Sequence, residues 1–133
     1  MALTVHIHSF GYSLSGIPAD PSGHGGGFVF DCRGLPNPGR EPAYQLMTGL
    51  DAPVQEYLSR FPEVDRFAQS SAALVQQTID SYHAQYFSHL MVAFGCTGGQ
   101  HRSVYQTERL RQYLSGQEGL IVQVTHLEQS LWP

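Results

Sequence analysis

The segment VAFGCTGGQHRS, residues 92–103, holds the residue types in this chain that could do chemistry. An apolar run ends at Gly95, Cys96 follows it, and Gly98 and Gly99 precede a histidine, an arginine and a serine. Such a segment can cradle an anion with backbone N–H groups, carry a cysteine nucleophile, or form a tight turn between a strand and a helix. Each interpretation depends on the elements around the segment.

The anion-binding interpretation depends on where the glycines stand. Residues 89–95 predict a buried strand and residues 101–116 a helix, so the glycines lie at the carboxyl end of a strand and the start of a helix. Open α/β sheets bind ligands there, and free amides and the helix dipole favour an anion. Gly98 and Gly99 let the backbone curl, and Arg102 can grip phosphate with its planar guanidinium. A turn that needs glycine for geometry alone is the alternative.

The nucleophile interpretation rests on the spacing C-x5-R from Cys96 to Arg102, with Ser103 next. This spacing resembles the loop of cysteine-dependent phosphatases, in which a thiolate attacks phosphorus and arginine holds the oxygens. The start of a helix would lower the pKa of the thiol, as that chemistry requires. Gly95 stands where that family has histidine, and Asp31 is the one candidate acid. A buried, inert cysteine is the alternative.

Composition limits the possible functions. At 133 residues with 41% hydrophobic residues, the chain predicts one globular domain over residues 1–133. The basic residues are all arginine, which excludes a phosphate-loop lysine and a Schiff-base lysine. The net charge of −4 argues against a strong nucleic-acid footprint. We find no export signal and no stretch near the roughly 20 apolar residues of a membrane helix, so we predict a cytoplasmic protein with reduced cysteines.

Hydrophobic periodicity predicts an alternating α/β order. The expected strands cover residues 3–10, 28–33, 89–95 and 119–126, and the expected helices cover residues 52–61, 63–87 and 101–116. Asp51 is expected to cap the first helix, and the second carries a stripe of Val64, Phe67, Ser71, Leu74, Thr78 and Tyr82. The last strand, helix and strand form a β-α-β unit, so those two strands should be parallel. The fold class is therefore α/β, a small single-domain sheet with at least one parallel β-α-β unit.

Two further patterns concern loops and metals. Residues 11–27 are rich in Gly, Pro and Ser and predict a long loop, mobile without ligand, that could close over an anion as a lid. His6 and His8 share one face of a strand and could chelate a metal with His24 or His126. No second close ligand pair accompanies them, so we predict an exposed strand face, no metal site and no cofactor.

Four motifs in the same order give a more specific indication: SFGY, FDCRGLPNPGREP, MTGLDAPVQEYL and GCTGGQHRSVYQTERL. Together they resemble the C-terminal domain of the RNase adapter protein RapZ and its stand-alone relatives, from about residue 4 to residue 128. The resemblance implies a fold similar to a phosphofructokinase subdomain, a homo-oligomer, a pocket that senses the phosphosugar glucosamine-6-phosphate, and an RNA-binding surface.

The resemblance also implies which residues bind. Its pocket would use Thr97, Gly98, His101 and Arg102, with Arg33 reaching in from the neighbouring strand end. Gly99 and Ser103 complete the candidate ligand-binding set, and His101 is expected to donate to the anion. The family's loop lysine is Gln100 here, and its basic tail is replaced by HLEQSLWP. We therefore predict a sensor or regulatory domain for a phosphosugar or nucleotide, with weak RNA binding; the alternatives are an RNA adapter and a phosphatase using Cys96 and Arg102.

Overall fold

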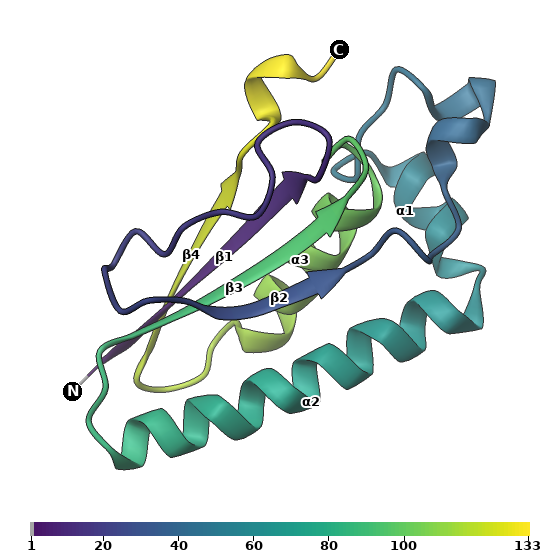
Figure 1. The fold of residues 1–133 in the computed structure, drawn as a ribbon. Coiled ribbons are helices and arrows are strands. Elements are labelled where there is room, and N and C mark those ends of the chain that lie inside the picture. Colours follow the sequence, from purple (N-terminus) through teal and green to yellow (C-terminus); the bar gives the residue numbers. More distant parts are fainter. Residues whose placement is uncertain (1) are drawn as a thin grey trace.

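The structure is a computed structural model that describes residues 2–133. Its strands are β1 (Leu3–Gly11), β2 (Gly27–Asp31), β3 (His89–Cys96) and β4 (Leu120–His126). Its α-helices are α1 (Ala52–Ser59), α2 (Pro62–Ala84) and α3 (Arg102–Leu114) (Figure 1). The strands form one parallel sheet in the order β2-β3-β1-β4. The predicted α/β class is confirmed.

The order of the strands follows from their burial. β1 and β3 are buried along most of their length, whereas β2 and β4 alternate between more and less exposed residues. A strand in the middle of a parallel sheet is covered on both faces, and an edge strand tolerates polar residues. The predicted β-α-β unit, β3-α3-β4, is therefore parallel as expected, with β1 inserted between its two strands.

One face of the sheet carries the main core. Leu3, Val5 and Ile7 of β1 lie on it, and the register places Val92 of β3 beside Ile7. Helices α2 and α3 cover this face through their buried apolar residues, which are Ala72, Val75 and Ile79 of α2 and Leu110 and Leu114 of α3. This packing holds α3 against the strand that leads into it.

The predicted apolar stripe of α2 is partly wrong. Leu74 is 51% exposed, and the buried residues of the helix are Val64, Ala68, Ser71, Ala72, Val75 and Ile79. Residues 71 and 72 are small, so this face of α2 can approach its neighbours closely. The helical periodicity was right, but its largest side chains do not all point inward.

Asp51 is the N-cap residue of α1, as expected, but its side chain does not cap the helix. The carboxylate of Asp51 accepts a hydrogen bond from the Thr48 N–H at 2.8 Å, and it caps no amide of the helix. The backbone carbonyl of Asp51 still accepts the amides of Val54 and Gln55. Asp51 therefore stabilises the turn that precedes α1.

The loop between β1 and β2 covers the other face of the sheet, and Figure 1 shows it running back from the carboxyl end of β1. His8 is only 3% exposed and His6 is half-buried, so the predicted exposed face for this pair is wrong. Their rings stack at 4.0 Å, and burial, with a contribution from His6, lowers the pKa of His8 to about 4. His24 lies against His89 instead.

The described chain, residues 2–133, holds neither a metal-ligand cluster nor a helix that could span a membrane. Within this range no three His, Cys, Asp or Glu side chains are placed to hold a metal ion together. None of the described helices has both the length and the apolar character that crossing a membrane requires.

Candidate anion-binding site

The connection between β3 and α3, residues 97–101, is called the glycine loop below. It lies at the carboxyl edge of the sheet, where Cys96 at the end of β3 pairs with Gly11 at the end of β1 (Figure 1). The loop therefore faces the start of the long β1–β2 loop on one side. The turn that follows β2 reaches the same edge, because Cys32 donates its amide to Gly95.

The amides of this connection are free. Across the described chain, residues 97–104 donate no backbone hydrogen bond, and the first amide to do so is that of Tyr105, to the His101 carbonyl at 2.9 Å. Helix starts leave such donors unsatisfied, and the helix dipole adds a partial positive charge. A continuous run of donors from the glycine loop into the first turn of α3 suits an anion.

The two glycines of the loop differ in what they require. Gly99 has φ +67°, and a Cβ there would lie 2.6 Å from Glu128 Cγ and 2.7 Å from the Gly11 nitrogen. Gly98 lacks a positive φ, and a Cβ there would meet no atom within 4 Å. Gly99 is thus needed by the fold, since its backbone touches that of Gly11. Gly98 presents bare backbone to open space.

Arg102 is buried in the first turn of α3, with 5% of its surface exposed. Its Nη1 donates to the carbonyls of Arg33 at 2.8 Å and Leu35 at 3.1 Å, so the guanidinium holds the turn after β2. Its buried Nε has no partner among residues 2–133. A buried donor without an acceptor costs about 1–3 kcal/mol. Because the atom is buried, an anion oxygen could satisfy it only after the side chain shifts.

Arg33 lies at the same edge but is paired with a neighbour. Its side chain makes two hydrogen bonds with Asp31, at 2.9 and 2.8 Å, and its guanidinium carbon sits 3.7 Å from the centre of the Tyr12 ring. The hydrogen bonds from Arg33 lower the pKa of Asp31. Asp31 is therefore an ionised carboxylate bound to Arg33. A general acid must hold a proton, so this arrangement does not suit Asp31 for the acid role in the phosphatase alternative.

Gln100 and His101 point away from the free amides. Gln100 donates to the carbonyls of Gln45 and Met47, and His101 Nε2 donates to the Tyr44 carbonyl at 2.9 Å. Burial lowers the pKa of His101, which favours the neutral ring. A neutral ring with its proton on Nε2 offers only an acceptor at Nδ1. These two side chains thus anchor residues 44–47, and a donor role for His101 stays a prediction.

The thiol of Cys96 lies beneath the glycine loop. It is 3% exposed and donates to the hydroxyl of Ser103 at 3.1 Å, and Ser103 is itself fully buried. A cysteine nucleophile needs an accessible thiolate. The Cys96–Ser103 contact therefore supports the start of α3 from inside the core.

The segment after β4 also reaches the site, and sequence reasoning missed it. The carboxylate of Glu128 binds the Gly11 amide, and the indole N–H of Trp132 donates to the Gly99 carbonyl at 3.0 Å. The contacting residues are more than thirty positions apart in the sequence, so no local pattern predicts these contacts. The C-terminal segment HLEQSLWP thus supplies part of the site wall.

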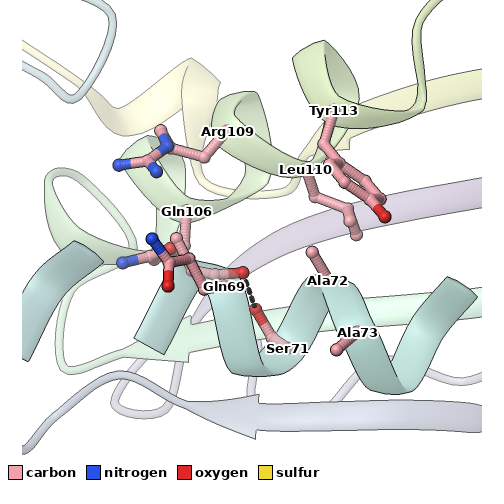
Figure 2. Close-up of a pocket in the computed structure, with 9 residues that line it drawn as sticks. Gln69, Ser71, Ala72, Ala73, Gln106, Arg109, Leu110 and Tyr113 are labelled. Atoms are coloured by element: carbon pink, nitrogen blue, oxygen red, sulfur yellow. Dashed lines mark hydrogen bonds between the residues drawn. The ribbon is translucent and has the colours of Figure 1, made fainter. Parts of the chain in front are cut away.

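A separate cavity of about 230 Å³ lies between α2 and α3. Figure 2 shows Gln69 and Ala72 of α2 on one side and Arg109, Leu110 and Tyr113 of α3 on the other. Its lining comes from these two helices, whereas the free amides stand at the start of α3 and in the loop before it. It therefore adds nothing to the anion site.

The fold and the edge site define a small α/β domain with a glycine turn ahead of a helix. The chain belongs to the RapZ C-terminal domain family, whose model matches residues 3–130. This confirms the resemblance drawn from the four motifs.

Several longer proteins are similar to this chain over most of its length. A nucleotide-binding protein of Shewanella woodyi is 43% identical over 128 residues, which is 96% of this chain and 43% of that protein. Nucleotide-binding proteins of Alkalilimnicola ehrlichii and Acidithiobacillus ferrooxidans are 43% and 40% identical, over 90% and 95% of this chain and 40% of each relative. The chain thus spans less than half the length of these relatives.

Proposed function

We propose that this domain is a regulatory sensor whose glycine loop binds the phosphate of a small phosphorylated molecule. The observation that carries the proposal is the run of free amides over residues 97–104, with the partnerless Nε of Arg102 beside it. Backbone donors, a helix dipole and a guanidinium together match the oxygens and charge of a phosphate.

The names of the relatives support a phosphorylated ligand. They are called nucleotide-binding proteins, and each is more than twice as long as this chain, so that property comes to this domain only as part of the proposal. The family resemblance implies a phosphosugar, glucosamine-6-phosphate. Both ligands share the phosphate group that the free amides would bind.

Substitution of Gly98 tests whether the glycine loop binds phosphate. Gly98→Ala meets no protein atom and needs no unusual φ, so the fold and the thermal midpoint should be unchanged. A methyl group on bare backbone should block the approach of a phosphate and weaken its binding about tenfold or more, the scale of a lost charged hydrogen bond. Calorimetric titration with glucosamine-6-phosphate, glucose 6-phosphate, AMP and ATP measures both proteins. Equal affinities for every ligand would sink the assignment of the glycine loop.

The arginines bear on the RNA-adapter alternative. Arg33, Arg60, Arg109 and Arg111 are paired with carboxylates, and Arg102 holds carbonyls inside the site. This leaves Arg40 and Arg66 as the exposed arginines without an ion pair among residues 2–133. An RNA surface needs cations free to replace counterions. The structure thus favours the small-molecule proposal over the RNA adapter and, because the Cys96 thiol is buried, over the phosphatase.

A further inference from the structure

We infer that residues 127–132, called the strap below, hold the glycine loop and the start of the β1–β2 loop in one arrangement. Glu128 and Trp132 are its positioning residues: they contact the backbone around the free amides and set its orientation. The inference rests on the proposed function of the glycine loop, and it names residues that neither the motifs nor the family resemblance assigned.

Glu128 binds the first of the two loops. Its Oε2 accepts the amides of Gly11 at 3.0 Å and Ser15 at 3.1 Å, and its Oε1 accepts the Ser15 hydroxyl at 2.8 Å. The residue is 3% exposed, and its Cγ lies 2.6 Å from the position that a Cβ of residue 99 would take. One carboxylate therefore fixes residues 11–15 while its stem packs on the glycine loop.

Trp132 binds the second loop. Its indole N–H donates to the Gly99 carbonyl at 3.0 Å. The Gly99 carbonyl and the Gln100 N–H belong to one planar trans peptide and point in opposite directions. A carbonyl held by Trp132 thus turns the Gln100 amide, one of the free donors, away from the strap. The indole sets the orientation of part of the anion site.

The base of the strap is itself fixed. His126, the last residue of β4, is hydrogen-bonded on both ring nitrogens, to Ser9 Oγ at 2.6 Å and to Glu108 Oε2 at 2.7 Å. The Leu127 amide donates to the Ser9 carbonyl at 2.9 Å, and the Trp132 ring lies 5.5 Å from the His126 ring. The strap is thereby tied to β1 and α3 before it reaches the glycine loop.

The burial of Glu128 decides between two roles for its carboxylate. It could compete with a bound anion, or it could shape the wall beside one. Both oxygens accept hydrogen bonds, and the residue is only 3% exposed. Displacing the side chain would strand two backbone donors and leave a gap against Gly99. The carboxylate is therefore part of the wall.

The first test replaces the indole. Trp132→Phe keeps an aromatic ring against His126 and removes the N–H that holds Gly99. We expect affinity for inorganic phosphate and for a hexose 6-phosphate to fall about 5- to 10-fold, with a thermal midpoint close to the wild type. The amide resonances of Gly99 and Gln100 should also move without ligand. Unchanged affinity together with unmoved resonances would overturn the inference.

The second test separates positioning from competition at Glu128. Glu128→Gln keeps an acceptor for the two amides and removes the charge, so phosphate affinity should stay equal or rise. Glu128→Ala removes the acceptors, so affinity should fall about fivefold or more. Tighter binding by the alanine variant would show a competing carboxylate and would refute positioning. If that variant does not fold, the Trp132→Phe data decide.

The two proposals fail in different ways. If the wild type binds none of inorganic phosphate, the hexose 6-phosphates, AMP and ATP, the proposed function of the glycine loop is wrong. The strap is then judged by the ligand-free resonances of Gly99 and Gln100 in Trp132→Phe. Movement of those resonances supports positioning, and their constancy contradicts it, whatever the ligand result.

Discussion

Arg102 serves the fold and the candidate site at once. Its Nη1 holds the turn after β2, whereas its Nε faces no acceptor. Arginine suits this double task because its donors are spread over a rigid plane. The sequence predicted the ligand contact from the loop spacing. The structural contact was not predictable, because it joins residues far apart in the chain.

We expect Arg102→Ala to weaken binding of a phosphosugar or nucleotide by roughly 1.5–3 kcal/mol, the scale of a hydrogen bond to a charged group. The same variant should lose stability, because the carbonyls of Arg33 and Leu35 lose their donor. Calorimetric titration and thermal unfolding measure the two effects separately. Arg60→Ala, which removes an exposed i,i+4 pair, is the matched control and should change neither. Full affinity in Arg102→Ala would contradict the ligand contact.

Cys96 supports the start of α3, so its replacement by serine should spare the binding function. We expect Cys96→Ser to bind the same ligand as the wild type, because a hydroxyl can replace the thiol beside Ser103. The wild type should hydrolyse p-nitrophenyl phosphate no faster than buffer. Turnover that is lost in Cys96→Ser would establish the phosphatase alternative.

At the scale of elements, the sequence pattern predicted the strands and helices whose formation depends on residues close together in the chain. Alternation in β1 and β4 and the 3.6-residue period in α2 and α3 arise within each segment, so these elements could be located from sequence. The insertion of β1 between β3 and β4 could not, since strand order is set by which strands must be buried on both faces. The burial of His8 was missed because the alternation of a strand does not tell what covers each face of the sheet.

The β1–β2 loop divides into two parts. Its start is fixed to the glycine loop, because Tyr12 and Ser13 donate to the carbonyls of Cys96 and Thr97, and Glu128 holds Ser15. The middle part, residues 17–20, has no donated backbone hydrogen bond in the described chain. The residues that could move as the lid proposed from sequence are therefore residues 17–20.

We expect a saturating phosphorylated ligand to slow amide exchange at Ile17 and Asp20. The amide of Ser13 should already be protected without ligand, because it has an acceptor. Hydrogen–deuterium exchange with and without ligand measures both regions in one experiment. Equal rates at Ile17 and Asp20 in the two states would leave the loop as a static cover of the sheet.

At the scale of the whole molecule, charge decides which partners fit. The chain carries a net charge of −4, and most of its arginines are engaged within the fold. A polyanion is repelled on average unless cations are concentrated on one face. Assembly into an oligomer, which the family resemblance implies, is the one route by which scattered arginines could be gathered.

We therefore expect binding to structured RNA no tighter than the non-specific range, roughly 10⁻⁴–10⁻⁶ M, and steeply weakened by salt. Filter binding at physiological salt measures the affinity, and light scattering on the same sample gives the oligomeric state. Nanomolar, sequence-selective binding would reverse the ranking and place the RNA adapter first.

The position of Trp132 has a practical consequence. It is the one tryptophan in the sequence, and its indole nitrogen is hydrogen-bonded to the glycine loop. Indole fluorescence responds to the polarity and hydrogen bonding of its surroundings, so any ligand that shifts the Gly99 carbonyl should change the emission. The chain thus carries its own optical reporter beside the candidate site. Unlabelled protein in a plate reader can be screened against a library of phosphorylated metabolites before any ligand is known.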